Sequence, residues 1–230
     1  MDAVKPVAPV TREDAQLVID ALSQHVGDER REKLERVVAS RLGGLVVVLE
    51  QLVDPHNGGA ALRSCEANGV REVHVVGSTF GFSERVTQGC DKWLDIARDE
   101  TIERCAGELK ARGFKLYAAV PGARVALEEL DPLAPAAFLV GNERDGLTAA
   151  ARAACDVEFA IPMHGFSQSV NLSVATALCV YTHASRRRRA LGAVGDLDAD
   201  ARLQLLADYY RRDVRGAEAI VARAHKERQA

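Results

Sequence analysis

The sequence predicts an α/β domain built on a parallel sheet, with helical extensions at both ends of the chain. Short apolar, mostly β-branched runs alternate with segments of helical periodicity, and most connections between them are short. The first run, residues 45–49, reads Leu-Val-Val-Val-Leu, which is typical of a strand buried on both faces of a parallel sheet. The chain has 230 residues, 47% of them hydrophobic, which is enough for one large domain with appendages.

Strands and helices are expected to alternate through the middle of the chain. The expected strands span residues 45–49, 72–77, 115–120, 136–141 and 157–161. The expected helices between them span residues 60–67, 101–112 and 148–154, with a short helical piece at 127–130. Thr148 is a candidate N-cap of its helix. The Gly/Ser/Thr-rich connection at 78–90 is long, which favours a functional loop.

Helical segments are expected on both sides of this domain. Residues 12–40 have the apolar spacing of one or two amphipathic helices, which Gly43-Gly44 should end. Residues 1–10 contain two prolines and no periodicity, so we expect disorder there. The expected divisions are an N-terminal helical extension (1–44), a central domain (45–185) and a basic helical extension (186–230) that begins at Arg186-Arg187-Arg188-Arg189.

The charge distribution is uneven, although the net charge is only -3. Residues 46–185 carry twelve Lys and Arg against eighteen Asp and Glu, whereas residues 186–230 carry eleven against seven. An acidic middle with a basic tail suggests that an anionic partner is bound by the ends of the chain. The alternative is a solvated helical surface. The segment 28–33 has the same two interpretations, as a salt-bridged helix face or as a contact to an RNA backbone.

The sequence lacks the signature motifs of several protein classes. It has no G-x-G-x-x-G after a strand, which disfavours a dinucleotide-binding site, and no P-loop for a nucleotide. It also has no H-E-x-x-H metal motif and no G-x-S-x-G esterase motif. Its five cysteines are widely spaced and form no C-x-x-C, so we expect no disulfide framework, no metal site and a reducing cytoplasmic setting. The longest apolar runs are too short to span a bilayer, and the N-terminus lacks the pattern of a signal peptide, so no membrane association is expected.

The stretch 161–181 joins the last expected strand to a helix. Pro162 ends the strand, a polar loop follows, and apolar residues then recur at helical spacing from Val170 to Tyr181. Ser167 and Ser169 are candidate N-caps of that helix. Such strand–loop–helix junctions bind ligands in open α/β folds. A capped core helix with an ordinary loop is the alternative.

Polar loops follow three of the expected strands. The first reads Asp54-Pro55-His56-Asn57 and leads to Arg63-Ser64-Cys65; the second reads Gly141-Asn142-Glu143-Arg144-Asp145-Gly146-Leu147; the third reads Ile161-Pro162-Met163-x4-Gln168-Ser169-x-Asn171-x-Ser173. In order and spacing these stretches resemble the three signature motifs of the SPOUT superfamily. The closest resemblance is to its SpoU branch of RNA 2′-O-ribose methyltransferases, of the TrmH type that modifies guanosine 18 of tRNA. It covers residues 30–210.

The resemblance implies a fold and a function. The implied fold is a parallel α/β domain whose C-terminal segment forms a deep trefoil knot. The implied cofactor is S-adenosylmethionine, held in the knot largely by backbone groups of the second and third loops. A homodimer is implied, with each active site completed by the partner subunit, and terminal helices are implied to hold tRNA. The alternatives are a ribosomal RNA 2′-O-methyltransferase and a non-catalytic knotted RNA-binding protein.

The resemblance also implies site residues. The implied catalytic residues are Asn57, Arg63, Glu143, Ser169 and Asn171. The implied cofactor-binding residues are Gly141, Asn142, Leu147, Ile161, Met163, Ser169 and Leu172. Arg63 is implied to activate the ribose hydroxyl. Because a guanidinium is a poor base that offers donors and no acceptor, clamping the phosphate and the hydroxyl suits Arg63 better than removing a proton.

Each of these residues has an ordinary structural alternative. Arg63 could form a surface salt bridge, Asn57 could cap the helix of Arg63, and Glu143 could interact with a helix dipole. Ser169 and Asn171 lie two residues apart at a helix start, so one could cap while the other reaches the site. Ile161, Met163 and Leu147 could simply pack in the core.

Overall fold

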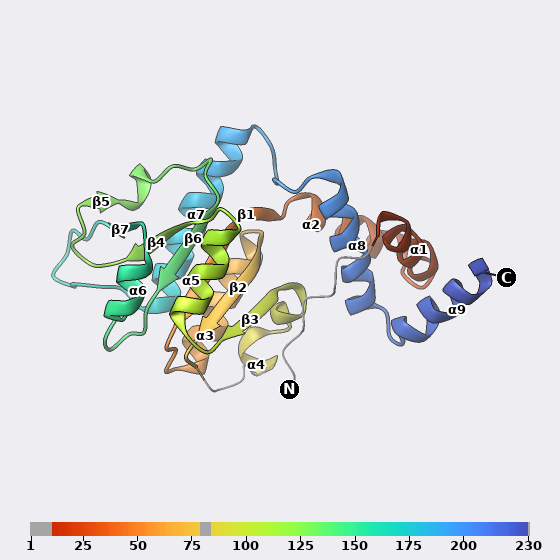
Figure 1. The fold of residues 1–230 in the computed structure, drawn as a ribbon, viewed down its shortest axis with the longest axis horizontal. Coiled ribbons are helices and arrows are strands. Elements are labelled where there is room, and N and C mark those ends of the chain that lie inside the picture. The colour runs from red at the N-terminus through yellow and green to blue at the C-terminus, as the bar shows by residue number, and fades with distance from the viewer. Residues whose placement is uncertain (1–10, 79–83, 230) are drawn as a thin grey trace. The chain divides into compact units, whose positions relative to one another are not determined.

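The structure, a computed structural model, describes residues 11–78 and 84–229. The disorder expected for residues 1–10, and part of the candidate loop at 78–90, lie outside the described residues. The elements, labelled as in Figure 1, are α1 (Arg12–Ser23), α2 (Asp28–Ala39), β1 (Leu42–Glu50), α3 (Pro55–Ala67), β2 (Val70–Val76), α4 (Glu84–Thr87), η1 (Cys90–Trp93), β3 (Asp95–Asp99), α5 (Ile102–Ala111), β4 (Lys115–Ala119), β5 (Val125–Ala126), η2 (Leu127–Glu129), β6 (Ala136–Val140), α6 (Ala149–Ala154), β7 (Val157–Ala160), α7 (Leu172–Leu191), α8 (Ala199–Asp213) and α9 (Ala217–Gln229).

The described residues form two compact units. The sheet unit, residues 42–193, contains β1 to β7 and the helices α3 to α7. The helical unit combines residues 11–41 with residues 194–229 and contains α1, α2, α8 and α9.

The sheet unit is built on a seven-stranded sheet with the order β3-β2-β1-β6-β4-β7-β5. Every neighbouring pair is parallel, which confirms the predicted α/β class. Gly43 and Gly44 do not break a helix: α2 ends at Ala39 and both glycines lie inside β1. β3 and β5 have no counterpart among the predicted strands. β3 reads Asp-Ile-Ala-Arg-Asp and lies at the edge of the sheet, where charged residues are common and the apolar pattern is weak.

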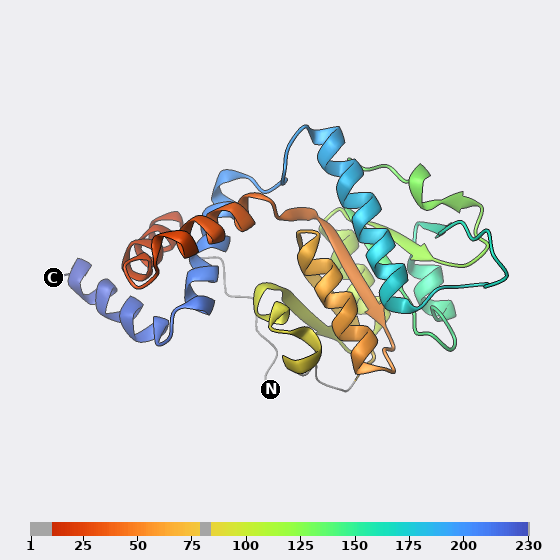
Figure 2. The same cartoon turned by 180° about the vertical axis from the view of Figure 1, so that it is seen from behind.

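The two faces of the sheet carry separate cores because side chains alternate along a strand. Val47 and Leu49 pack with residues of α3 and α7, the helices seen in front of the sheet in Figure 2. Val46 and Val48 pack with residues of α5 and α6, seen in front in Figure 1. All four side chains are fully buried, and each such burial contributes about 1.5–3 kcal/mol. The central strands therefore form a rigid base for the loops at their ends.

Two helix starts differ from those predicted from the sequence. α3 begins at Pro55, and Asp54 is its N-cap, accepting a hydrogen bond from the His56 backbone N–H at 2.8 Å. The expected start at residue 60 and the capping role of Asn57 are therefore wrong. α7 begins at Leu172 with Asn171 as N-cap, so Ser167 and Ser169 do not cap it. Asp54 and Asn171 directly precede the first turns of α3 and α7. The backbone N–H groups of a first turn have no partner within the helix, so the side chain just before that turn can accept from them.

The four consecutive arginines do not begin a separate extension. α7 continues through them to Leu191 and ends at Gly192, which has a left-handed φ of 63°. The expected boundary between residues 185 and 186 therefore falls inside a helix.

Three of these arginines bind backbone carbonyls of the sheet unit. Arg186 donates to the Leu130 carbonyl at 2.7 Å, and Arg188 donates to the Asn68 carbonyl at 2.9 Å. Arg187 is buried, and its Nη1 lies 2.9–3.1 Å from the carbonyl oxygens of residues 132–134. Arg186, Arg187 and Arg188 therefore attach α7 to neighbouring segments of the sheet unit through hydrogen bonds.

The helical unit has its own buried apolar residues and ion pairs. Leu22, Leu34 and Tyr209 are buried in α1, α2 and α8. Arg30 donates two hydrogen bonds of 2.9 Å to Asp213, and Arg31 pairs with Asp28, as expected of a salt-bridged helix face. Within the described residues, no helix is long and apolar enough to cross a membrane.

Candidate active site

The three polar loops predicted from the sequence lie at one edge of the sheet. They follow β1, β6 and β7, and the carboxyl ends of parallel strands lie at the same edge. A pocket of about 520 Å³ opens there. Its lining comprises Ala119, Val120, Pro121, Val140, Gly141, Asn142, Glu143, Arg144, Asp145, Gly146, Ile161, Met163, Gln168, Ser169, Val170, Asn171, Leu172 and Ala175.

Hydrogen bonds beside this pocket join the first turn of α3 to the second and third loops. Asn171 Nδ2 donates to Asn57 Oδ1 at 3.0 Å, and Asn57 Nδ2 donates to Glu143 Oε1. Asn57 is 114 residues from Asn171 and 86 from Glu143 in the sequence. We call these three residues the amide–carboxylate chain.

The direction of the amide–carboxylate chain is fixed at both ends. The Asn171 Oδ1 accepts from the Ser173 backbone N–H at 2.8 Å and from the Ser173 hydroxyl at 2.7 Å. A backbone N–H can only donate, so the Asn171 amide must turn its Nδ2 toward Asn57. Asn57 must then present its oxygen to Asn171 and its nitrogen to the Glu143 carboxylate. Asn171 thus caps α7 and orders the site together.

The loop between β6 and α6 folds tightly around two glycines. The Asn142 Oδ1 accepts from the backbone N–H groups of Arg144 (2.9 Å) and Asp145 (2.7 Å). Gly146 has a left-handed φ of 70°. A Cβ on Gly141 would lie 2.1 Å from the Gly146 carbonyl carbon, so only glycine permits this approach. The loop presents backbone to the pocket at both positions.

Arg63 lies outside the lining of the pocket. It is exposed on α3, six residues after Asn57, and within the described part of the chain its guanidinium makes no hydrogen bond or ion pair. It lies near Cys90, where burial raises the thiol pKa to about 11 against the opposing effect of the Arg63 charge. Within residues 11–78 and 84–229, its alternative role in a surface salt bridge is therefore not observed.

Comparison with known proteins identifies the family. The model of the SpoU rRNA methylase family matches residues 44–181. The chain belongs to the SpoU methylase family. A tRNA (guanosine(18)-2′-O)-methyltransferase of Thermus thermophilus is 36% identical over 191 residues, covering 80% of this chain and 97% of that relative. The SpoU resemblance expected from the three motifs is confirmed.

Solved SpoU structures share the fold. The TrmH/SpoU tRNA modifying enzyme of A. aeolicus has 30% identity and a TM-score of 0.74, covering 82% of this chain and 98% of its own. An AdoMet-bound rRNA methyltransferase from Sinorhizobium meliloti has 29% identity and a TM-score of 0.59, covering 69% of this chain and 60% of its own. The trefoil knot is expected for this fold.

SpoU enzymes use S-adenosylmethionine, and the pocket fits this cofactor. Apolar residues such as Ile161 and Leu172 line it together with polar Gln168 and Ser169. An adenosine joined to a charged amino acid needs both kinds of surface. The glycine-lined backbone of the loop at 141–146 permits the close approach that such a ligand requires.

Most of the cofactor residues implied by the SpoU motifs line the pocket, with one exception. Leu147 packs against the core on the α5–α6 face instead. Gln168 and the segment 119–121 line the pocket but are absent from the implied set. Residues 119–121 follow the end of β4, so their place at the carboxyl edge of the sheet was the signal that could have found them.

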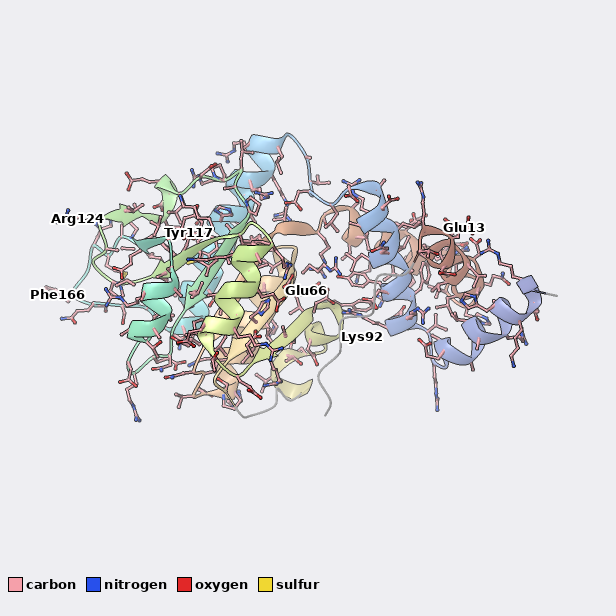
Figure 3. The ribbon with its side chains drawn as sticks, in the orientation of Figure 1. Glu13, Glu66, Lys92, Tyr117, Arg124 and Phe166 are labelled. Carbon is pink, nitrogen blue, oxygen red and sulfur yellow. The ribbon has the colours of Figure 1, made fainter. Side chains whose placement is uncertain are left out.

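The third SpoU loop ends in an exposed aromatic residue. Phe166 is fully exposed and points away from the sheet unit (Figure 3). Met163 is 37% exposed and lines the pocket. Ser169 is exposed at the pocket and stands outside the amide–carboxylate chain. The loop therefore offers apolar and polar groups beside the cofactor pocket.

A second group of ionisable residues lies away from the SpoU site. Ligand-type atoms of His74, Asp99 and Cys105 lie within 4.8 Å of one another. The ring nitrogens of His74 lie 2.7 Å from Asp99 and 2.8 Å from Glu72. Burial alone would lower the pKa of His74, but hydrogen bonds with Cys105, Glu72 and Asp99 raise it to about 11. Two carboxylate partners suit a doubly protonated imidazolium rather than a metal ligand, and the absence of a metal stays a prediction.

Proposed function

We propose that this chain transfers a methyl group from S-adenosylmethionine to the ribose 2′-hydroxyl of guanosine 18 in tRNA. The observation that carries the proposal is the amide–carboxylate chain, which joins the first turn of α3 to two loops beside a pocket that fits the cofactor. The name of the Thermus thermophilus relative supports the substrate, because this chain covers 97% of that relative.

We assign the catalytic and cofactor-binding roles to residues at or beside the pocket. The proposed catalytic residues are Asn57, Arg63, Glu143, Ser169 and Asn171. The proposed cofactor-binding residues are Gly141, Asn142, Ile161, Met163, Ser169 and Leu172, with Gln168 added from the pocket lining. Leu147 is proposed to support the pocket loop by packing against the core on the α5–α6 face of the sheet.

When bound, S-adenosylmethionine supplies an electrophilic methyl group on a sulfonium. The residues of this chain orient the ribose hydroxyl against it, and orientation is a large part of the catalysis. Asn171 and Asn57 hold the Glu143 carboxylate at the pocket. The Arg63 guanidinium offers a fork of N–H donors and no acceptor, so it clamps the RNA phosphate and the hydroxyl rather than acting as a base.

We further infer a homodimer in which each site takes Arg63 from the partner. Val174 (45% exposed), Leu178 (38%) and Tyr181 (64%) are large apolar residues on α7. Their spacing places them on one face of the helix, and such an exposed stripe is typical of an interface. Arg63 is exposed and outside the lining of its own pocket. A molar mass of one chain in solution, measured by light scattering at micromolar concentration, would contradict the dimer.

The proposed setting of the protein is the cytoplasm. All five cysteines are free thiols, which suits a reducing compartment.

The helical unit is the proposed tRNA-binding part. Several basic residues of the unit are already in ion pairs, including Arg211 with Glu218 and Arg212 with Asp208. Exposed Lys33 and Arg36 on α2 are therefore better candidates for phosphate contacts. Double replacement of Lys33 and Arg36 by Ala should weaken tRNA binding and reduce its salt dependence; unchanged binding would exclude them.

The test is transfer of labelled methyl from S-adenosylmethionine to a tRNA transcript, with the modified nucleotide mapped. The matched control transcript carries 2′-deoxyguanosine at position 18 and should accept no label. Label on ribosomal RNA fragments but not on tRNA would keep the chemistry and overturn the substrate. No label on either RNA, with tight tRNA binding, would favour a non-catalytic RNA-binding protein.

A further inference from the structure

Glu50 is a buried carboxylate at the end of β1 that the proposed reaction does not use. It is 2% exposed, and the alternation along the strand places it on the same face as Val46 and Val48. Its Oε2 accepts from the Thr148 backbone N–H at 2.9 Å, and its Oε1 accepts from the Thr148 hydroxyl at 2.7 Å. It has no ion-pair partner among residues 11–78 and 84–229. Both oxygens are thus directed at one residue.

Thr148 closes the loop that lines the cofactor pocket. The Thr148 Oγ1 also accepts from the Ala151 backbone N–H at 3.1 Å, as the N-cap of α6. At the other end of the loop, Val140 of β6 pairs with Leu49, the neighbour of Glu50. Residues 141–146, which lie between these two anchors, all line the pocket. The loop is therefore attached to β1 at both of its ends.

The loop is tight enough to transmit a displacement at Thr148. The Gly146 backbone N–H donates to the Asn142 carbonyl at 3.1 Å, and the backbone of Gly146 and Leu147 packs directly against Gly141. A shift of the Thr148 end would therefore move the backbone that faces the pocket.

We propose that Glu50 is a positioning residue for cofactor binding, which it supports by holding Thr148 and so the pocket loop at 141–146. The proposal rests on the proposed function. A carboxylate suits this place because it offers two acceptors to two donors. A glutamine of the same shape offers one acceptor, and its amide nitrogen would face a donor.

The test measures binding of S-adenosylhomocysteine by titration calorimetry, without RNA. Glu50→Gln and Thr148→Val should each weaken binding about tenfold, as expected for a lost hydrogen bond to a charged group. Thr148→Ser keeps both donors and should bind like the wild type. In the methyl-transfer assay Glu50→Gln should raise KM for the cofactor, while kcat and KM for tRNA stay near wild type. The double variant Glu50→Gln/Thr148→Val should be no weaker than Thr148→Val alone, because Thr148→Val already removes the hydroxyl that donates to Glu50, together with the N-cap bond from Ala151.

Glu72→Gln is the matched control. Glu72 is another hydrogen-bonded carboxylate of the sheet, paired with Arg112 at 2.6 Å and away from the pocket loop. It should lower the free energy of unfolding without changing the affinity for S-adenosylhomocysteine. Equal weakening by Glu50→Gln and Glu72→Gln would overturn the proposal, as would wild-type affinity in folded Glu50→Gln. If Glu50→Gln does not fold, the comparison of Thr148→Val with Thr148→Ser decides. A wild type that binds the cofactor but methylates no RNA would overturn the proposed function only.

Discussion

The Asn57 side chain connects two other residues of the candidate site. It lies in the middle of the amide–carboxylate chain, where its oxygen must face Asn171 and its nitrogen must face Glu143. Nothing in the sequence near Asn57 distinguishes this role from helix capping. The capping position is taken by Asp54, which leaves the Asn57 amide to the site. Its function depends on partners that folding brings from two other loops.

The isosteric change Asn57→Asp should remove most of the methyl-transfer activity. It replaces the donor that faces Glu143 with a second carboxylate, and an unpaired or repelled group at such a place costs about 2–3 kcal/mol, or about 30- to 150-fold in rate. Steady-state kinetics with tRNA and S-adenosylmethionine measure the effect.

Asn68→Asp is the matched control for that change. Asn68 follows the same helix, and its Nδ2 donates to the Ser64 carbonyl at 2.8 Å, away from the pocket. This variant should lose about 1 kcal/mol of stability and keep its activity. Equal activity in the two variants would remove Asn57 from the site.

His183 makes the stability of the fold depend on pH. It is fully buried in α7 against Phe138, and within the described residues neither ring nitrogen has a hydrogen-bond partner. Burial, together with the charges of Arg187 and Arg186, lowers its pKa to about 4. The unfolded chain, with a pKa of about 6.5, binds the proton more readily. The contribution of His183 is therefore fully present above pH 6.5 and is lost as the pH falls toward 4.

Replacement of His183 by Leu should flatten the loss of stability between pH 6.5 and 4. The lowering of the His183 pKa from 6.5 to about 4 corresponds to about 3 kcal/mol of stability. Urea unfolding at pH 7.5, 5.5 and 4.5 measures it. His25 is exposed, and His25→Ala is the control for the loss of a histidine outside the core. A Leu variant with the wild-type slope would show that His183 is not the group responsible.

At the scale of elements, the sequence predicts a strand best where all of its side chains are in the same buried environment. β1 was predictable because Leu45 to Leu49 are buried on both faces, and the class of the sheet followed. β3 escaped prediction because an edge strand needs no continuous apolar run. The clearest error is the boundary predicted at the four arginines of α7. A run of positive charge indicates a solvated or RNA-binding surface, and only the tertiary structure shows that the carbonyl groups of Leu130 and of residues 132–134 accept from Arg186 and Arg187.

Arg187→Met should therefore act on stability rather than on RNA binding. The variant removes the charged donor from the carbonyl oxygens of residues 132–134, and losing hydrogen bonds to a charged group costs about 1.5–3 kcal/mol. Arg189→Met changes an exposed residue of the same run and should stay within about 0.5 kcal/mol of the wild type. Guanidinium unfolding compares the two. A neutral Arg187 variant with weakened tRNA binding would restore the interpretation of the run as an RNA contact.

At the scale of the whole molecule, Arg63 is the proposed catalytic residue that lies apart from the others. The motifs predicted one site for Asn57, Glu143 and Asn171. In the structure these three residues are joined by the hydrogen bonds of the amide–carboxylate chain. Arg63 belongs to the same motif as Asn57, yet it lies outside the pocket of its own chain. Sequence spacing reports which residues serve a site but not which subunit supplies them. The exposed stripe on α7 supports supply from a second copy.

Co-expression of two inactive variants can test this arrangement. Subunits carrying Arg63→Ala and Glu143→Gln would be given different tags, and the mixed dimer would be purified through both. If Arg63 acts in the partner's site, one of the two sites has both residues intact, and about half of the wild-type rate should return. If Arg63 acts in its own subunit, both sites stay defective and no activity returns. A mixed dimer of Arg63→Ala with the double variant Arg63→Ala/Glu143→Gln is the control, because no site in it has an Arg63. Recovery in the first dimer alone would place Arg63 across the interface, and no recovery would return it to its own pocket.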